Sequence, residues 1–301
     1  MKLTNRETRR LTWIGVVVAL AVACGPAVDQ NGPPPAHSER SFELRRVIEV
    51  AGRQGVATDG VHYYLSGSTE LYRYSKLGEL LSANEEALVG LDKPANHIGD
   101  IDVFQGELYA GIEWFENGQG RDIQIAVYDA ETLEYRRSFD WDPESGQVEV
   151  SAVVVDPDNG LVWMTDWVNG RYVYRYDLET GQYRGKLHLR PVPQWQQGIA
   201  YSGGHLYVTA DDGDADLDEA DNMWRVPAMA DGTAAFVEHA LEFSDFRRAG
   251  EIEGVTFDPT TGELLVLSNR GARIVLGTPS GFYPGYDREI HEVYVFAPVR
   301  K

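Results

Sequence analysis

Five segments of this sequence repeat one pattern, and the repetition limits the possible folds more than any other feature. In each segment an apolar strand with a small residue near its start is followed by a tight turn and a second apolar or aromatic strand. The segments align on Gly55, Asp100, Ala152, Gly198 and Gly254, at spacings of 45, 52, 46 and 56 residues. Repeats of this size built from short strands are typical of the blades of a β-propeller, each with four strands.

The ends of the repeated region indicate how such a ring would close. The fifth repeat ends near residue 296 with no room for a fourth strand, whereas the apolar segment 42–50 precedes the first repeat and belongs to none. Pairing 42–50 beside 293–296 would complete the fifth blade and remove an exposed sheet edge. We therefore predict an all-β chain over residues 41–301, folded as a single propeller of five blades with four antiparallel strands each. Six blades are the alternative.

The N-terminal segment has the pattern of an export signal. Residues 1–10 are basic, residues 11–23 are an apolar run too short to span a bilayer, and Cys24 follows. This arrangement resembles the lipobox of bacterial lipoproteins, which implies that residues 1–23 are removed and that acylated Cys24 anchors the chain in a lipid bilayer. Gly25 in place of Asp implies the outer membrane in that family. An ordinary cleaved signal is the alternative. Residues 24–40 would then form a flexible tether to an extracytoplasmic domain.

Composition excludes several classes of function. The chain has 47 acidic and 27 basic residues, a net charge of −20, and this argues against nucleic acid as a partner. A single cysteine excludes a disulfide framework and a cysteine-based zinc site. No Gly-x-Ser-x-Gly or His-Glu-x-x-His motif is present. We expect a monomer.

The loop lengths indicate which face of the ring carries the function. Turns between the first and second strands are short, whereas the loops between the second and third strands are longer, and long loops on a rigid scaffold commonly carry binding sites. The first residues of the inner strands would rim the channel at this face. They are Gln54, His97, Asp100, Glu149, Ser151, Trp195, Gln197, Glu251 and Glu253.

Several carboxylates near one axis would repel one another unless a cation lies among them. We predict that Asp100, Glu149 and Glu253 bind a divalent metal, with Ca²⁺ expected, and that His97 or Glu251 moves protons. For Asp100 the alternative is that it accepts hydrogen bonds from backbone N–H groups of neighbouring strands. The acidic run 211–218 is interpreted as a solvated loop, since it lacks the glycine and glutamate of an EF-hand loop.

Other side chains near the same face could contact a ligand. Trp114, Trp167 and Trp195 would offer stacking surfaces, Gln197 would donate or accept hydrogen bonds, and Arg270 and Arg273 could bind an anion. The predicted function is binding of a small ligand at a metal-bearing channel mouth. Metal-dependent hydrolysis of an ester, lactone or phosphate is left open. The alternative is a non-catalytic propeller that binds a glycan or a protein.

The segment 251–258, Glu-Ile-Glu-Gly-Val-Thr-Phe-Asp, resembles the Glu-Gly openings of inner strands in the gluconolactonase/senescence-marker family and in phytase-like esterase propellers. In the former family such a glutamate binds the catalytic divalent metal, which implies this role for Glu253. Those members have six blades. The Gln54-Gly55-Val56 segment also resembles the five-bladed plant-type glutaminyl cyclases.

Overall fold

The computed structural model describes residues 41–211, 220–243, 250–275 and 278–299. All of them belong to one unit, Glu39–Lys301, which is separate from residues 1–38. The predicted signal, Cys24 and the tether lie outside the described residues, as does most of the acidic run (Asp212–Asp218).

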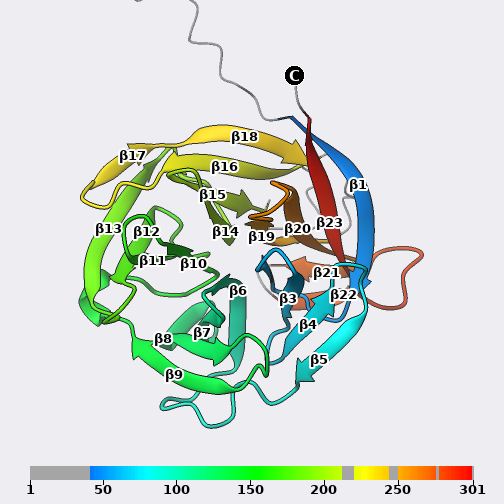
Figure 1. The fold of residues 1–301 in the computed structure, drawn as a ribbon, viewed down its shortest axis with the longest axis horizontal. Coiled ribbons are helices and arrows are strands. Elements are labelled where there is room, and N and C mark those ends of the chain that lie inside the picture. The colour runs from blue at the N-terminus through cyan, green and yellow to red at the C-terminus, as the bar shows by residue number, and fades with distance from the viewer. Residues whose placement is uncertain (1–40, 212–219, 244–249, 276–277, 300–301) are drawn as a thin grey trace, which may run out of the picture. The chain divides into compact units, whose positions relative to one another are not determined.

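Five antiparallel sheets surround a central axis as the blades of a propeller, which confirms the predicted fold (Figure 1). Blade 1 contains β2 (Gly55–Thr58), β3 (His62–Ser66), β4 (Leu71–Ser75) and β5 (Leu80–Asn84). Blade 2 contains β6 (His97–Phe104), β7 (Glu107–Glu116), β8 (Gln119–Asp129) and β9 (Tyr135–Asp140). Blade 3 contains β10 (Val153–Asp156), β11 (Leu161–Met164), β12 (Tyr172–Asp177) and β13 (Tyr183–Arg190). Blade 4 contains β14 (Gln196–Ser202), β15 (His205–Ala210), β16 (Asp221–Pro227) and β18 (Glu238–Phe243).

Blade 5 is built from both ends of the propeller, as the orphan segment predicts. Its order is β19 (Ile252–Phe257), β20 (Leu264–Arg270), β23 (Ile290–Val299) and, outermost, β1 (Ser41–Val50). The register runs from Ser41 opposite Val299 to Val50 opposite His291. Strand β1 therefore covers the outer edge of β23 (Figure 1).

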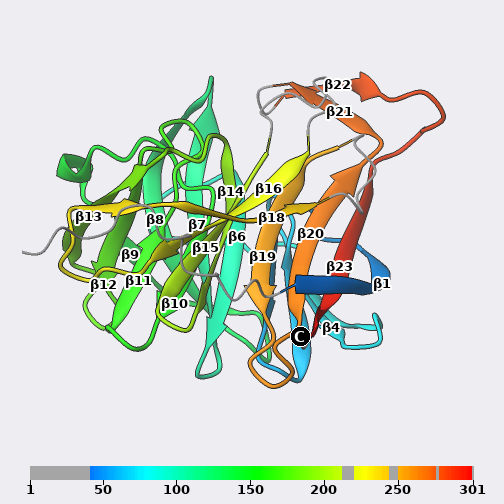
Figure 2. The same cartoon turned by 90° about the horizontal axis from the view of Figure 1, so that it is seen from above.

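Three elements depart from the simple repeat. Strand β17 (Ala234–Phe236) adds a parallel partner to the outer strand β13 of blade 3. The hairpin β21 (Ala272–Val275) and β22 (Thr278–Phe282) is inserted between β20 and β23, and Figure 2 shows it beyond the end of blade 5. A short 3-10 helix, η1, covers Pro143–Ser145. Within the described ranges, no helix has the length and apolar character needed to cross a membrane.

Crowding at the axis explains the small residues in the repeat. A Cβ added to Gly55 would lie 2.5 Å from Asp100 Cα, and one added to Gly198 would lie 2.8 Å from Gly254 Cα. Such distances are shorter than van der Waals contact, so side chains are excluded from these positions. The inner strands therefore pack backbone to backbone.

Asp100 joins all five inner strands. Its fully buried carboxylate accepts hydrogen bonds from four backbone N–H groups, those of Val56 (2.9 Å), Ile101 (2.9 Å), Ile199 (3.2 Å) and Val255 (3.2 Å). Its own N–H donates to Ser151 O of blade 3 at 2.8 Å. Because a carboxylate has about four lone-pair positions, these bonds leave none for a metal ion. The structure thus favours the alternative interpretation of Asp100, in which it accepts backbone hydrogen bonds, over the predicted role as a metal ligand.

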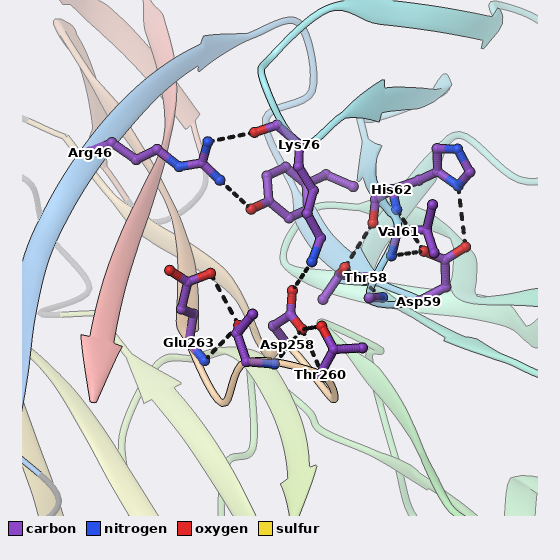
Figure 3. Close-up of polar contacts among 12 residues, drawn as sticks. Arg46, Thr58, Asp59, Val61, His62, Lys76, Asp258, Thr260 and Glu263 are labelled. Carbon is purple, nitrogen blue, oxygen red and sulfur yellow. Dashed lines mark hydrogen bonds and ion pairs between the residues drawn. The ribbon is translucent and has the colours of Figure 1, made fainter. Parts of the chain in front are cut away.

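On the tight-turn face, side chains fasten the closing blade to blade 1 (Figure 3). Arg46 of β1 donates to Lys76 O at 2.6 Å and to the Tyr63 hydroxyl at 2.7 Å. Lys76 Nζ in turn contacts Asp258 Oδ2 of the β19–β20 turn at 2.5 Å. The N-terminal strand is therefore held by the neighbouring blade as well as by its own sheet.

Candidate functional site

A cavity of about 200 Å³ lies at the mouth of the channel, on the long-loop face. It is lined by Arg53, Gln54, Ser68, His97, Phe115, Glu149, Ser151, Trp167, Gln197, Glu251, Glu253 and Ile274. These residues come from all five blades. They lie just before or within the inner strands, in the connections between second and third strands or, for Phe115, at the end of the second strand β7. Seven of the nine predicted rim residues line it, and Asp100 and Trp195 are the two that do not.

Irregularities in the inner strands occur at this mouth. The pairing of each inner strand with its neighbour shifts between Ile98 and Ile101, between Gln196 and Ile199, and between Ile252 and Val255. A bulge bends a strand and re-aims the side chains beside it, and bulges are common next to binding sites. In blades 4 and 5 the bulge therefore contains a polar residue that lines the cavity, Gln197 and Glu253 respectively.

One wall of the cavity holds a cluster of one histidine and two glutamates. His97, Glu113 and Glu149 each offer a ligand atom, and these atoms lie within 4.8 Å of one another. His97 begins β6, and Glu113 lies opposite it on β7. The distance from His97 Nδ1 to Glu113 Oε1 is 3.4 Å, and Nε2 of the same ring lies 3.4 Å from Gln54 Oε1.

Both glutamates of this cluster are buried with few donors. Glu113 is 0 % and Glu149 is 2 % exposed. Glu113 accepts a hydrogen bond from Val150 N at 3.1 Å, and Glu149 accepts one from Trp167 N. Repulsion between the two carboxylates favours a proton on one of them.

The electrostatic consequence is a set of raised carboxyl pKa values. Burial raises the pKa of Glu149 well above its ordinary value, and repulsion from Glu113 and Asp166 adds to this shift. Burial also raises the pKa of Glu113, although hydrogen bonding to His97 opposes the shift. Burial raises the pKa of neighbouring Asp166 to about 6. A cation in this cluster would favour the charged forms of all three.

Sequence reasoning named His97 and Glu149 but not Glu113. The prediction considered inner strands only, whereas Glu113 lies on the second strand of its blade. The pairing of β7 with β8 shifts between Ile112 and Trp114, so a bulge occurs at Glu113. The signal in the sequence was a single glutamate directly after the largely apolar run 108–112. A buried acid at the end of an apolar strand is uncommon enough to be noted.

A second polar group lies on blade 5 and includes Glu251 and Glu253. Glu253 is 2 % exposed, and its Oε1 accepts a hydrogen bond from Asn269 Nδ2 at 2.8 Å. Arg53 Nη2 lies 3.2 Å from Glu289 Oε1 and 3.8 Å from Glu251 Oε2. Burial and repulsion from Glu251 raise the pKa of Glu253 well above its ordinary value, against the attraction of Arg53. Glu253 is thus in the cavity but not in the histidine cluster.

The predicted aromatic residues divide into two groups. Trp167 lines the cavity, and the Trp195 ring packs against it with 4.9 Å between ring centroids. Trp114 lies under the guanidinium of Arg121, 5.0 Å from the ring centroid, and does not line the cavity.

The two predicted arginines do not line the cavity either. Arg270 forms two 2.8 Å contacts with Glu292, so its charge is already paired. Arg273 lies over the Tyr283 ring, 6.0 Å from its centroid. Of the polar ligand-binding candidates only Gln197 lies in the cavity wall.

Comparisons with known proteins give no family for this chain. No family model and no curated protein matches its sequence. Among solved structures, it is similar to Kuenenia stuttgartiensis hydrazine synthase, with a TM-score of 0.41 and 13 % sequence identity. The match covers 71 % of this chain and 63 % of that chain, so this protein spans less than two thirds of the length of the one it matches.

Proposed function

We propose that this propeller binds a small ligand in the cavity at its channel mouth, beside a divalent metal ion held by His97, Glu113 and Glu149. The observation that carries the proposal is the convergence of three ligand atoms within 4.8 Å at the wall of that cavity. Donor atoms that share an ion at about 2.1 Å lie roughly 3 to 4 Å apart, so small side-chain rotations would complete the site.

The one imidazole and two carboxylates of the cluster favour Zn²⁺ or a first-row transition-metal ion over the Ca²⁺ expected from sequence. Ca²⁺ prefers six to eight oxygen ligands, whereas an imidazole with two carboxylates suits Zn²⁺ or Mn²⁺. Three protein ligands would leave a coordination position open for a ligand atom. In this arrangement His97 holds the ion, so Glu251 is the better candidate to move a proton.

Thermal unfolding with and without the ion tests this proposal. After treatment with EDTA, saturating Zn²⁺ or Mn²⁺ should raise the melting temperature by about 5 °C, because an ion that binds only the folded state stabilises it. Glu113→Gln should remove this shift. Glu116→Gln, an exposed acid on the same strand, is the matched control and should keep it. If no ion shifts the wild-type melting curve, the two carboxyl groups simply share a proton and the metal proposal fails.

Whether the site is catalytic depends on the same ion. A bound metal would polarise the oxygen of an ester, lactone or phosphate and acidify a water molecule. Turnover of such substrates by the metal-loaded protein, and its loss in Glu251→Gln with metal binding unchanged, would support a hydrolase. Metal and ligand binding without turnover would favour the non-catalytic alternative.

We also propose that the protein is a lipoprotein anchored through Cys24 on the extracytoplasmic side of a bacterial membrane, the outer one by the residue at position 25. The support is the basic start, the apolar run 11–23 and the chain's single cysteine directly after it. Labelling with a fatty-acid analogue in a bacterial host should mark the wild type and not Cys24→Ser. An unlabelled wild type recovered in the soluble fraction would favour an ordinary cleaved signal.

A further inference from the structure

Apolar side chains are exposed at one corner of the tight-turn face, where blades 5 and 1 meet. Val61 of the β2–β3 turn is 63 % exposed, and Leu77 of the β4–β5 turn is 81 % exposed. Leu80, which begins β5, is 53 % exposed, and Val299, which ends β23, is 41 % exposed. In the corresponding turns of blades 2 and 3, no described residue exposes a large aliphatic or aromatic side chain to this extent. We call these four residues the turn patch.

Contacts between the turns bring the members of the patch together. The β4–β5 turn reaches the β19–β20 turn through the 2.5 Å bond from Lys76 to Asp258 (Figure 3). The β2–β3 turn packs on the same turn, since a Cβ added to Gly60 would lie 2.6 Å from Thr260 Cγ2. Because β20 pairs with β23, the end of β23 also lies beside the β19–β20 turn. Exposed apolar side chains gathered in one place indicate an interaction surface.

The chain enters the propeller at this corner. Strand β1 begins at Ser41, directly opposite Val299 of the turn patch. Residues 25–40 separate Ser41 from Cys24, the residue that we propose to be acylated. A chain of that length spans at most about 60 Å, so a bilayer that holds Cys24 lies within this distance of Ser41. The turn patch is therefore exposed apolar surface at the point of attachment.

The charges around the patch suit a zwitterionic lipid surface better than an anionic one. Lys76 is paired with Asp258, and the acids Asp59 and Glu79 are exposed in the same turns as Val61 and Leu77. The whole sequence has a net charge of −20. Apolar side chains can enter the interfacial region of a bilayer, whereas anionic headgroups repel acidic side chains.

We propose that the turn patch is the surface through which this protein contacts a zwitterionic bilayer, with Val61 and Leu77 in the interfacial region. The inference rests on the proposed anchor at Cys24 and deepens it, since it fixes which face of the propeller meets the membrane. Hairpin β21–β22, which contributes Ile274 to the cavity, lies at the opposite end of blade 5 (Figure 2). The cavity then opens away from the bilayer, and its ligand enters from the aqueous side.

Fluorescence quenching on phosphatidylcholine vesicles tests this orientation. The acylated protein has no other cysteine, so Thr261→Cys in the β19–β20 turn and Val168→Cys in the β11–β12 loop of the other face each take one fluorescent label. A nitroxide-bearing lipid should quench the label at 261 at least about threefold more than the label at 168. Replacing a third of the lipid by phosphatidylglycerol should reduce the quenching at 261, because the acids beside the patch are repelled.

Variants of the patch test its part in the contact. In the chain labelled at 261, Leu77→Ser should lower the quenching about twofold, since it removes the most exposed apolar side chain of the patch. Phe282→Ser is the matched control, because Phe282 is an exposed apolar residue of β22 at the opposite end of blade 5, and it should leave the quenching unchanged.

A second form of attachment separates this inference from acylation. Residues 24–301 with Cys24→Ser and an N-terminal hexahistidine tag are held on the same vesicles by a nickel-chelating lipid, and the label at 261 should again be quenched more. This preference together with an unlabelled wild type in the fatty-acid test would refute acylation and leave the contact surface standing. The inference is overturned if, in either form, the two labels are quenched equally or the label at 168 is quenched more. It is equally overturned if Leu77→Ser leaves the quenching at 261 unchanged, which would point to a protein partner for the patch.

Discussion

The two faces of the propeller use acidic side chains in opposite ways. On the tight-turn face Asp59 and Asp258 accept hydrogen bonds from their own turns: Asp59 from Val61 N at 2.7 Å and His62 N at 2.6 Å, and Asp258 from Thr260 N at 2.8 Å (Figure 3). At the channel mouth Glu113, Glu149 and Glu253 have fewer donors and lie near other acids.

The carboxyl pKa values follow this difference. Burial of Asp258 is outweighed by hydrogen bonds from Lys76 and Thr260, which lower its pKa to about 2. Hydrogen bonds from its own turn likewise lower the pKa of Asp59 despite partial burial. The three glutamates at the mouth shift in the other direction. Acids whose charge the local backbone satisfies stabilise the fold, whereas acids left without donors mark a candidate site.

Asp100 tests this distinction most severely, since burial raises its pKa as it does for the glutamates at the mouth, although four backbone N–H groups donate to it. Asp100→Ala leaves four buried N–H groups without an acceptor, and we expect it to lower the free energy of unfolding by about 3 kcal/mol or more. Asp100→Asn, which keeps one acceptor oxygen, should cost less. Denaturant unfolding should give the same loss with EDTA and with Zn²⁺. A loss seen only with metal present would place Asp100 in the metal site.

The pH dependence of stability should separate the two faces. A carboxyl with a raised folded pKa holds its proton in the folded state while the unfolded chain releases it near the ordinary value of 4.5. Stability is therefore full below that value and falls as pH rises toward the raised one. We expect the metal-free protein to lose about 1 to 3 kcal/mol between pH 5.5 and pH 8.

Asp59 and Asp258, with lowered pKa values, contribute only below about pH 4, whereas Asp102, whose pKa is raised to about 7 by burial, adds to the slope in this window. Urea unfolding at several pH values measures the slope, and Glu113→Gln should make it shallower. Added Zn²⁺ should stabilise more at pH 8 than at pH 5.5, because metal and protons compete for the same groups. A metal-free protein that becomes more stable from pH 5.5 to pH 8 would contradict the shifts assigned to the mouth.

The sequence was sufficient for the fold because a propeller repeats one supersecondary unit. Aligning Gly55, Gly198 and Gly254 identified the inner strands, and the unpaired segment 42–50 identified the closing strand, which pairs with β23 as predicted. The strand-start argument also placed His97, Glu149, Glu251 and Glu253 around one cavity. Periodicity alone was enough for these because each blade presents the same strand position to the axis.

What the sequence could not supply was the direction of individual side chains. Glu113 reaches the mouth from a second strand through a bulge, which has no local sequence signature. The carboxylate of Asp100 turns to the backbone N–H groups of other blades, contacts between residues as far apart as 100 and 255. Arg270 is paired with Glu292, which lies on β23 two residues beyond Ile290, the residue opposite Arg270. These side-chain directions depend on the tertiary arrangement. The sequence therefore predicts more polar residues for the site than the site contains.

The smallest expected effect lies at the seam between blades 5 and 1, on the tight-turn face. Lys76 bonds Asp258 Oδ2, and the Asp258 side chain is fully buried. Lys76→Met should lower the free energy of unfolding at neutral pH by about 1 kcal/mol, the usual contribution of one such bond. Lys93→Met, which breaks the more exposed pair with Asp140, is the matched control and should change it by less than about 0.5 kcal/mol.

The acid unfolding of Lys76→Met gives a second and independent measurement. A carboxyl with a lowered folded pKa contributes stability above its ordinary value of 3.8, and this is lost as pH falls toward about 2. Without Lys76 the pKa of Asp258 should rise toward 3.8, so acid unfolding of Lys76→Met should begin at a higher pH than that of the wild type or of Lys93→Met. An unchanged acid midpoint would mean that the N–H and hydroxyl groups of the turn are enough to stabilise the charged form of Asp258. The seam would then be stabilised by the strand pairing between β1 and β23 and not by this ion pair.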